Sequence, residues 1–322
     1  MTKKRSFVRN YAEYGLLRLV SLAVSLLPDR AALGFGEALG ALMRAADRRH
    51  RRVAGANLAA AFPGQPPREI ERLTRGVYRH LGLVLVESLR IGRTLRRGIG
   101  KVVEQPDLSQ VKELLAEGRG VIVITAHLGN WEIAGHATSE LVVPLHSVAR
   151  PLDNPLLERW VDRMRTLTRQ KVIGKRGAVR EMLHVLKGGG AVAILMDQDA
   201  RRHGIFVDFF GRRASTWPTA AALSLKLGCP IVFGFVRRKG RAFRYELVVD
   251  SVFRPEPTGD READIRDLTQ RLTARIEDCI RACPEQWLWL HRRWKTQPPA
   301  ADPAGTAAAG GSAPQGCRPA EG

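Results

Sequence analysis

The chain has 322 residues, 44% of them hydrophobic, and its 52 Lys and Arg exceed 32 Asp and Glu to give a formal net charge of +20. This length fits one large domain or two modest ones, and the apolar content argues against a disordered chain. The four cysteines form no CxxC pair, which argues against a zinc ribbon or a thioredoxin-type site. Aromatic residues, at 6%, are too few for the long stacking surfaces of single-strand nucleic-acid binders.

Positive charge is concentrated in the first third of the chain. Residues 1–101 hold 20 Lys and Arg against 7 Asp and Glu, a net charge of +13. Two apolar runs, 11–28 and 31–46, lie among basic residues, and the uncharged stretch 19–28 is too short for a spanning helix, which needs about 20 residues. We therefore expect 1–52 to form basic helices associated with an anionic membrane surface. A single short tilted span and a helix pair packed on the protein's own core are the alternatives.

Strands and helices alternate through the middle of the chain. Buried or edge strands are predicted by β-branched and alternating runs at 121–125, 145–149, 191–196, 230–236 and 244–252. Helices are predicted at 111–118, 154–168, 178–189 and 260–283, after two helices within 53–97 that prolines separate. This alternation predicts an α/β fold with a central mostly parallel or mixed sheet and helices on both faces. The Pro/Ala/Gly-rich tail, 297–322, is predicted to be disordered.

The segment 121–137, VIVITAHLGNWEIAGHA, carries the chemistry. His127 lies just beyond a buried strand, where α/β sheets place reactive groups. Gly129 lets the chain turn and Asn130 is a candidate N-cap, which leaves the Glu132 carboxylate free. A spacing of five on one continuous helix would separate His127 and Glu132 by about 140°, so they meet only if the chain turns between them. A carboxylate that holds one imidazole nitrogen leaves the other as a base, so we predict that Glu132 orients His127.

This H-x-x-x-x-E box after a strand resembles the H-x-x-x-x-D/E box of the glycerolipid acyltransferase superfamily. The form HLGNWE resembles one branch, the late acyltransferases of lipid A biosynthesis that transfer lauroyl or myristoyl groups. Five further blocks resemble that branch in the same order: NLAAAFP (57–63), HLGLVLVES (80–88), VARPLDNP (148–155), MDQDARRHGIFVDFFGRRAST (196–216) and PEQWLWLHRRWKT (284–296). The resemblance makes 53–296 an acyltransferase domain with the glycerolipid acyltransferase-like fold.

The resemblance also implies the reaction. A fatty acyl chain would move from an acyl carrier protein or CoA thioester to a hydroxyl of a membrane glycolipid, in the first place a lipid A precursor. The acceptor hydroxyl belongs to the glycolipid itself or to one of its acyl chains. The enzyme would work at the cytoplasmic face of a bacterial inner membrane. The acyl thioester is a substrate, so neither a cofactor nor a metal is expected, and nucleic acid is not an expected partner.

Site residues follow from the same resemblance. His127 is the expected base and Glu132 its partner, while Arg150 and Asp197 are expected to line the site. A guanidinium such as Arg150 matches phosphate and oxyanion geometry. Three further residues are candidates for substrate binding: Asn130, Asp199 and Gly211.

Other interpretations remain open. The acceptor could be a lysophospholipid or a mannoside, or water could take its place in a hydrolase of similar design. The basic face could instead serve only to bind anionic lipid or nucleic acid. The tryptophans of 284–296 fit either a core-packing helix or a membrane interface.

Overall fold

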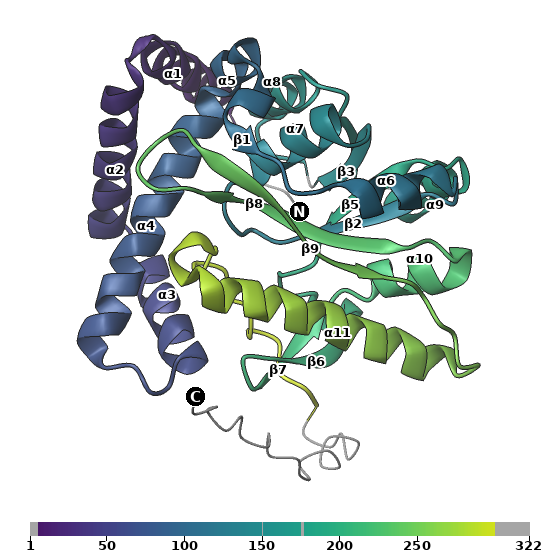
Figure 1. Cartoon of the computed structure of the whole chain (residues 1–322). Helices are drawn as coiled ribbons and strands as arrows, with labels where there is room; N and C mark the ends of the chain where they lie inside the picture. The colour runs from purple at the N-terminus through teal and green to yellow at the C-terminus, as the bar shows by residue number, and fades with distance from the viewer. Residues whose placement is uncertain (1–5, 150, 175–176, 300–322) are drawn as a thin grey trace, which may run out of the picture.

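The computed structural model describes residues 6–149, 151–174 and 177–299 (Figure 1). The helices are α1 (Phe7–Leu26), α2 (Asp29–Ala46), α3 (Arg48–Ala61), α4 (Pro67–Leu89), α5 (Ile91–Arg97), η1 (Ile99–Lys101), α6 (Ser109–Ala116), α7 (Trp131–Leu141), α8 (Pro155–Arg165), α9 (Ala178–Lys187), η2 (Arg201–His203), α10 (Thr219–Leu227), α11 (Arg261–Ala282) and η3 (Pro284–Gln286). The strands are β1 (Val103–Glu104), β2 (Val121–Thr125), β3 (Leu145–Ala149), β4 (Lys171–Gly174), β5 (Ala191–Leu195), β6 (Ile205–Phe209), β7 (Arg212–Thr216), β8 (Ile231–Arg238) and β9 (Tyr245–Phe253). Of the predicted tail, all but 297–299 lies outside the described residues.

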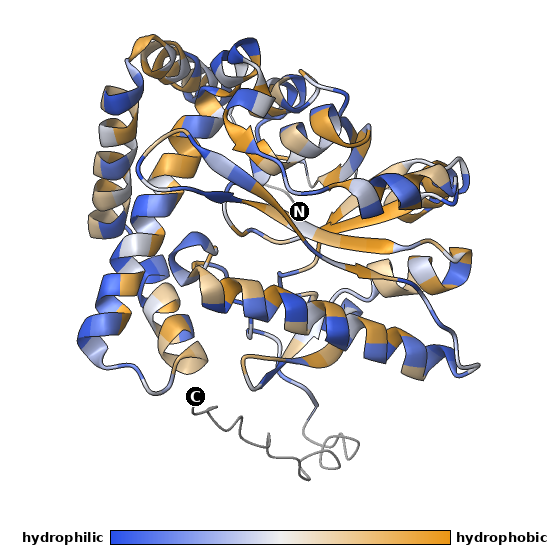
Figure 2. Ribbon diagram, in the orientation of Figure 1, coloured by the Kyte–Doolittle hydropathy of each residue, from blue (hydrophilic) through white to orange (hydrophobic). Residues whose placement is uncertain are grey.

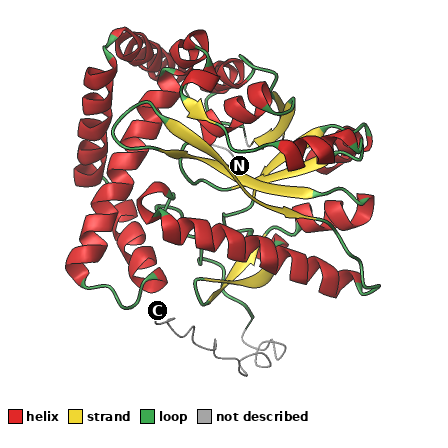
Figure 3. Cartoon of the chain, viewed as in Figure 1, coloured by secondary structure: helices red, strands yellow, loops and turns green. Residues whose placement is uncertain are grey.

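The centre of the protein is a seven-stranded sheet in the order β1-β9-β8-β2-β5-β3-β4, with helices on both sides (Figure 3). All neighbouring strands are parallel except β8 and β9. The predicted α/β fold with a mostly parallel, mixed sheet is therefore confirmed. The predicted edge strand, β9, lies one place in from the edge, because the short β1 pairs with it. A separate hairpin, β6–β7, was not expected from the sequence.

Strand β2 lies in the middle of the sheet and is covered on both faces. Ile122 and Ile124 belong to the main hydrophobic core, which also includes Leu272 and Ile276 of α11. The alternate residues of β2 face a cavity on the opposite side. Because both faces of β2 are covered, its residues form an unbroken β-branched run. The central strands are correspondingly apolar in Figure 2.

The tryptophans that follow α11 are core residues. Trp287, Trp289 and Trp294 are 2%, 0% and 6% exposed, and the chain around them is irregular after the single turn of η3. Each indole N–H has an acceptor; that of Trp289, for example, donates to the Pro284 carbonyl at 2.7 Å. Because these indoles are buried and their N–H donors have acceptors, the tryptophans pack in the core and do not form a membrane interface. They lie in an irregular segment and not in the helix considered above.

The N-terminal helices pack on α4 (Figure 1). Helix α2 crosses α4 so closely that a Cβ on Gly82 would lie 2.2 Å from the Gly36 carbonyl oxygen, and one on Gly40 2.3 Å from that of Tyr78. Within the described residues no helix is long and apolar enough to span a membrane. Helix α3 runs through the predicted domain boundary at residue 52. The outer face of α1 is apolar and exposed, and its association with a membrane stays a proposal.

We predict that Gly82→Ala destabilises the protein. The added methyl meets backbone atoms of α2, which cannot rotate away, so the two helices must separate. The free energy of unfolding should fall by about 3 kcal/mol, the upper end of the cost of overpacking. Urea unfolding followed by circular dichroism measures it. The control is Gly34→Ala, where a Cβ has nothing within 4 Å. Equal stability of the two variants would show that the crossing tolerates a methyl group.

Candidate active site

The loop between β2 and α7 carries His127 and is held by two distant segments. The Gly129 N–H donates to the Gln286 carbonyl at 2.9 Å, and the Asn130 N–H donates to the Val236 carbonyl at 2.9 Å. Gly129 has φ +61°, and a Cβ there would lie 1.9 Å from the Val236 oxygen. Only glycine fits this turn. The C-terminal segment and β8 therefore fix the loop from both sides.

The partner of His127 is Asp197, which follows β5. Nδ1 of His127 lies 2.9 Å from Oδ1 of Asp197, and the His127 backbone N–H donates to Oδ2 at 2.8 Å. The indole N–H of Trp287 donates to the same Oδ2 at 2.8 Å. Because an ionised carboxylate only accepts, the proton of the neutral imidazole is on Nδ1 and Nε2 is left as a base. Asp197 is 3% exposed, so this is a buried, fully hydrogen-bonded carboxylate.

The two groups shift each other's pKa. Burial by itself raises the pKa of Asp197, but the charge of His127 and the hydrogen bonds from His127 and Trp287 outweigh it and lower that pKa to about 2. Burial by itself lowers the pKa of His127, but the charge of Asp197 and the hydrogen bond to it, with a smaller contribution from Glu132, raise that pKa above its ordinary value. The pair thus combines an aspartate with a lowered pKa and an imidazole with a raised pKa.

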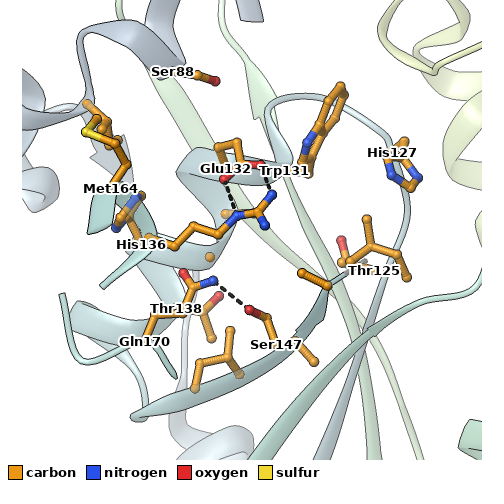
Figure 4. Close-up of a pocket in the computed structure, with 18 of the residues that line it drawn as sticks. Ser88, Thr125, His127, Trp131, Glu132, His136, Thr138, Ser147, Met164 and Gln170 are labelled. Atoms are coloured by element: carbon orange, nitrogen blue, oxygen red, sulfur yellow. Dashed lines mark hydrogen bonds and ion pairs between the residues drawn. The ribbon is translucent and has the colours of Figure 1, made fainter. Parts of the chain in front are cut away.

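Glu132 does not contact the imidazole, so the expected Glu132–His127 contact is not formed. Its carboxylate binds Arg165 of α8 through two bonds, at 2.6 Å and 3.1 Å. Figure 4 shows Glu132 and His127 on different sides of Trp131. The ring of Trp131 lies 5.2 Å from that of His127, edge to face. Arg165 was not recognised in the sequence, where it is one of several arginines on a predicted helix.

Asn130 has a structural role in the loop. Its Oδ1 accepts from the Ile133 N–H at 3.0 Å, which confirms it as the N-cap of α7. Its Nδ2 donates to Glu87 of α4 at 2.7 Å, and Glu87 also pairs with Arg238. Asn130 is completely buried in this network. Its amide thus takes part in contacts that hold the loop, and binding of substrate by Asn130 stays a prediction.

The remaining candidates lie elsewhere. Asp199 accepts from the Thr296 hydroxyl at 2.9 Å, and Gly211 is an exposed residue in the turn between β6 and β7. Neither belongs to the described lining of the cavity beside His127. Binding of substrate by these two residues stays a prediction. Arg150 lies outside the described residues.

A cavity of about 930 Å³ adjoins His127. Its floor is the sheet face, on which Val123 of β2 is level with Ala193 of β5 and Val232 of β8. Its walls come from α1, α4, α6, α7 and α8. The lining is mainly apolar, with a few polar side chains such as Gln170 and Ser147, whose Nε2 and Oγ are 2.8 Å apart (Figure 4). A cavity of this kind accommodates a long apolar group whose end reaches His127.

Comparison with known proteins decides the family. The family model of bacterial lipid A biosynthesis acyltransferases matches residues 2–296. The chain belongs to this family. It is 29% identical to the lipid A biosynthesis palmitoleoyltransferase of Escherichia coli K12 over 274 residues, 84% of this chain and 87% of the other. The lauroyltransferase of the same organism is 26% identical over 274 residues, 84% and 88% of the two chains.

A more distant relative acts on another lipid. The phosphatidylinositol mannoside acyltransferase of Mycobacterium tuberculosis H37Rv is 25% identical over 228 residues, which are 69% of this chain and 67% of that one. Family membership and the names of these relatives establish that this member is an acyltransferase. The expected family and enzyme class are thus confirmed.

Proposed function

We propose that this acyltransferase moves a fatty acyl chain from a thioester to a hydroxyl of a membrane glycolipid, in the first place a lipid A precursor. The observation that carries the proposal is the His127–Asp197 pair at the edge of a large apolar cavity. The names of the relatives refer to lipid A biosynthesis and to a phosphatidylinositol mannoside, which supports a glycolipid acceptor.

The cavity supports a long acyl chain. Val121, Val123, Thr125 and His127 all line it, and these six residue steps along β2 correspond to about 20 Å. An extended hydrocarbon with C–C bonds of about 1.5 Å advances about 1.3 Å per carbon. A track of this length suits a chain of roughly 12 to 16 carbons, in the range named for the family.

His127 would act as the general base. Nε2 takes the proton of the acceptor hydroxyl as its oxygen attacks the thioester carbonyl carbon, and the carbonyl becomes an oxyanion. When the tetrahedral intermediate collapses, the C–S bond breaks and the imidazolium returns the proton to the leaving thiolate. Asp197 stabilises the imidazolium that forms in between.

Glu132 and Arg165 have a different role in this proposal. Both line the cavity, and their charges act on the pKa of His127 in opposite directions, so the ion pair lies near the reacting groups. The Arg165 guanidinium can donate to an oxyanion or a phosphate, and the two bonds from Glu132 fix its orientation. Glu132 thus acts by orienting Arg165 and not by direct contact with His127.

Charge supports the choice of partners. The net charge of +13 over residues 1–101 suits an acidic acyl carrier protein as donor, with acyl-CoA as the alternative, and a phosphorylated lipid as acceptor. The exposed apolar face of α1 supports work at the surface of a membrane, which we take to be the cytoplasmic face of the bacterial inner membrane.

The raised pKa of His127 predicts a pH dependence. The base must be neutral to accept a proton, so kcat/KM should fall as the pH drops through the pKa of His127, which lies above the ordinary value of about 6.5. The acid limb of the pH profile should therefore lie on the alkaline side of that value. Initial rates between pH 5 and pH 9 with labelled donor measure it. A limb below pH 6 would contradict the proposed base.

The test of the function is product identification. The purified full chain is incubated with acyl carrier protein thioesters or acyl-CoA of different lengths, with and without a lipid A precursor, and the lipids are analysed by mass spectrometry. We expect a mass increment of one acyl group on the lipid A precursor. Acylation of only a lysophospholipid or only a mannoside would identify that lipid as the acceptor instead. Release of free fatty acid without lipid would indicate a hydrolase, and duplex DNA binding without any transfer would indicate a binding protein.

A further inference from the structure

Helix α1 is firmly anchored at its C-terminal end. The buried Arg90 donates from its guanidinium to the backbone carbonyl oxygens of Val24 and Leu27, and to Asp29 at 2.7 Å. Arg90 is 2% exposed, so removal of these bonds would leave a buried charge without partners. The turn between α1 and α2 is therefore a fixed point of the fold.

The N-terminal half of α1 is held by a different kind of contact. Asn154, in the loop before α8, donates from Nδ2 to the Asn10 carbonyl oxygen and to Glu13 Oε2, both at 3.0 Å. The Oδ1 of Asn154 is already occupied, because it accepts from the Leu156 N–H and caps α8. The bond to the Asn10 carbonyl oxygen is worth about 1 kcal/mol net, and the bond to the Glu13 carboxylate about 1.5–3 kcal/mol. Asn154 is 1% exposed, but its amide is neutral, so breaking these bonds leaves no buried charge at Asn154.

Helix α1 is apolar on two opposite sides. Leu17 and Val20 line the cavity, while Phe7, Leu19 and Leu22 on the outside are 72%, 66% and 61% exposed. A helix that is apolar on two sides belongs between two apolar environments. One of them is the cavity. The other has to be supplied from outside the chain.

The charges beside this face indicate what covers it. Arg9 and Arg18 of α1 are exposed, and so are Arg30 at the start of α2 and Arg96 of α5. Apolar side chains flanked by arginines suit the interface of an anionic bilayer, where the apolar groups enter the hydrocarbon and the guanidinium groups meet phosphates. A second copy of the chain would instead bring these arginines against one another.

The seam between α1 and α8 is the thin part of the wall. The two helices are in contact, and Leu16 and Leu17 of α1 and Leu157 and Trp160 of α8 all line the cavity. No residue of α8 is buried. Between the outer face of α1 and the cavity there is thus only one helix, and its attachment on the α8 side includes the contacts of Asn154.

We propose that an anionic bilayer covers α1 and that lipid enters the cavity sideways, through the seam between α1 and α8. The N-terminal half of α1 swings about the end that Arg90 anchors, and the bonds of Asn154 to Asn10 and Glu13 break and re-form. The inference rests on the proposed function, because it gives the route by which the lipid acceptor reaches His127. It explains why a cavity of about 930 Å³ is roofed by a helix whose outside is also apolar.

A reversible cross-link across the seam tests this route. In the full chain, with its four native cysteines replaced by alanine, Leu17→Cys and Leu157→Cys are joined by a short, reducible thiol cross-linker. Transfer from a labelled acyl thioester to a lipid acceptor in anionic phospholipid vesicles is then measured. The cross-link should slow transfer by about tenfold or more, because closure and opening of such elements often limit turnover. Reduction of the linker should restore the rate.

The matched control joins α1 to α4 at the anchored end. Ser21→Cys and Leu89→Cys lie where the Ser21 hydroxyl donates to the Leu89 carbonyl at 3.3 Å, and this contact does not move in the proposed opening. Cross-linking this pair should leave the rate within about twofold of that of its reduced form. Equal rates for the cross-linked seam and the cross-linked control would overturn the proposal. If the rate stays low after reduction, circular dichroism shows whether the variant is misfolded. In that case the seam is cross-linked instead through Leu16→Cys and Trp160→Cys.

A second measurement concerns the occupant. Trp131 and Trp160 line the cavity, so brominated acyl chains that enter it should quench tryptophan fluorescence. Vesicles with brominated lipid should therefore quench the fluorescence of the unsubstituted protein more than that of the Trp160→Phe variant. Cross-linking the seam should remove this difference. If the protein does not bind vesicles but forms a dimer that the Leu22→Asp substitution dissociates, a second copy of the chain covers α1 instead. If the uncross-linked protein transfers no acyl group to any lipid, the proposed function fails, whereas unchanged transfer in the cross-linked seam refutes only the route.

Discussion

Replacement of His127 by alanine is expected to lower acyl transfer by about two to four orders of magnitude, which is the usual contribution of a positioned general base. Nε2 of His127 is the only nitrogen of this imidazole that is left to accept a proton, because Nδ1 is bonded to Asp197. The residue lines the cavity and is not part of the hydrophobic core, so the protein should stay folded. The loss should appear mainly in kcat.

The measurement is the transfer of labelled acyl groups from a thioester to the lipid acceptor, together with circular dichroism. His184→Ala is the matched control, because His184 is an exposed histidine on α9 and does not belong to the described lining of the cavity. Its activity should match that of the wild type. Near-normal transfer by a folded His127→Ala protein would remove the base from the mechanism.

Asp197→Asn is expected to lower transfer by about a hundredfold or more, because an amide cannot hold the imidazole as a carboxylate does. The asparagine keeps the volume but offers one acceptor atom to three donors: the backbone N–H and ring of His127 and the indole of Trp287. Loss of the negative charge should also shift the acid limb of the pH profile to lower pH, since Asp197 is the strongest of the influences that raise the pKa of His127.

The pH profile separates a catalytic effect from a structural one. A variant that is merely less stable loses active protein without moving the limb, so the profile of Asp197→Asn is compared with that of Asp208→Asn, an exposed carboxylate on β6. The control should keep both the rate and the profile of the wild type. If Asp197→Asn behaved like the control, the base would not depend on this carboxylate.

The local pattern of the sequence was sufficient for five of the strands and for the position of His127. An unbroken β-branched run such as 121–125 is typical of a strand covered on both faces, and the regular alternation of strands with helices predicted the fold class. The position of His127 at the carboxyl end of a central strand followed directly. Strands β1, β4, β6 and β7 were not predicted, and β1 is only two residues long. Strand β4 is only four residues long, and the hairpin β6–β7 contains polar and aromatic residues without a clear period.

The partner of His127 was decided by the tertiary structure alone. A local pattern can only offer neighbours in sequence, and it offered Glu132, five residues away. The sheet instead pairs β2 and β5 in parallel, with Thr125 level with Leu195, so that His127 and Asp197 each lie two residues beyond the same edge. The cavity has the same origin, because its walls come from helices far apart in the chain. The sequence by itself thus determined five of the strands, the position of His127 and the family. Strand register and helix packing decided which carboxylate holds the His127 imidazole and where the cavity lies.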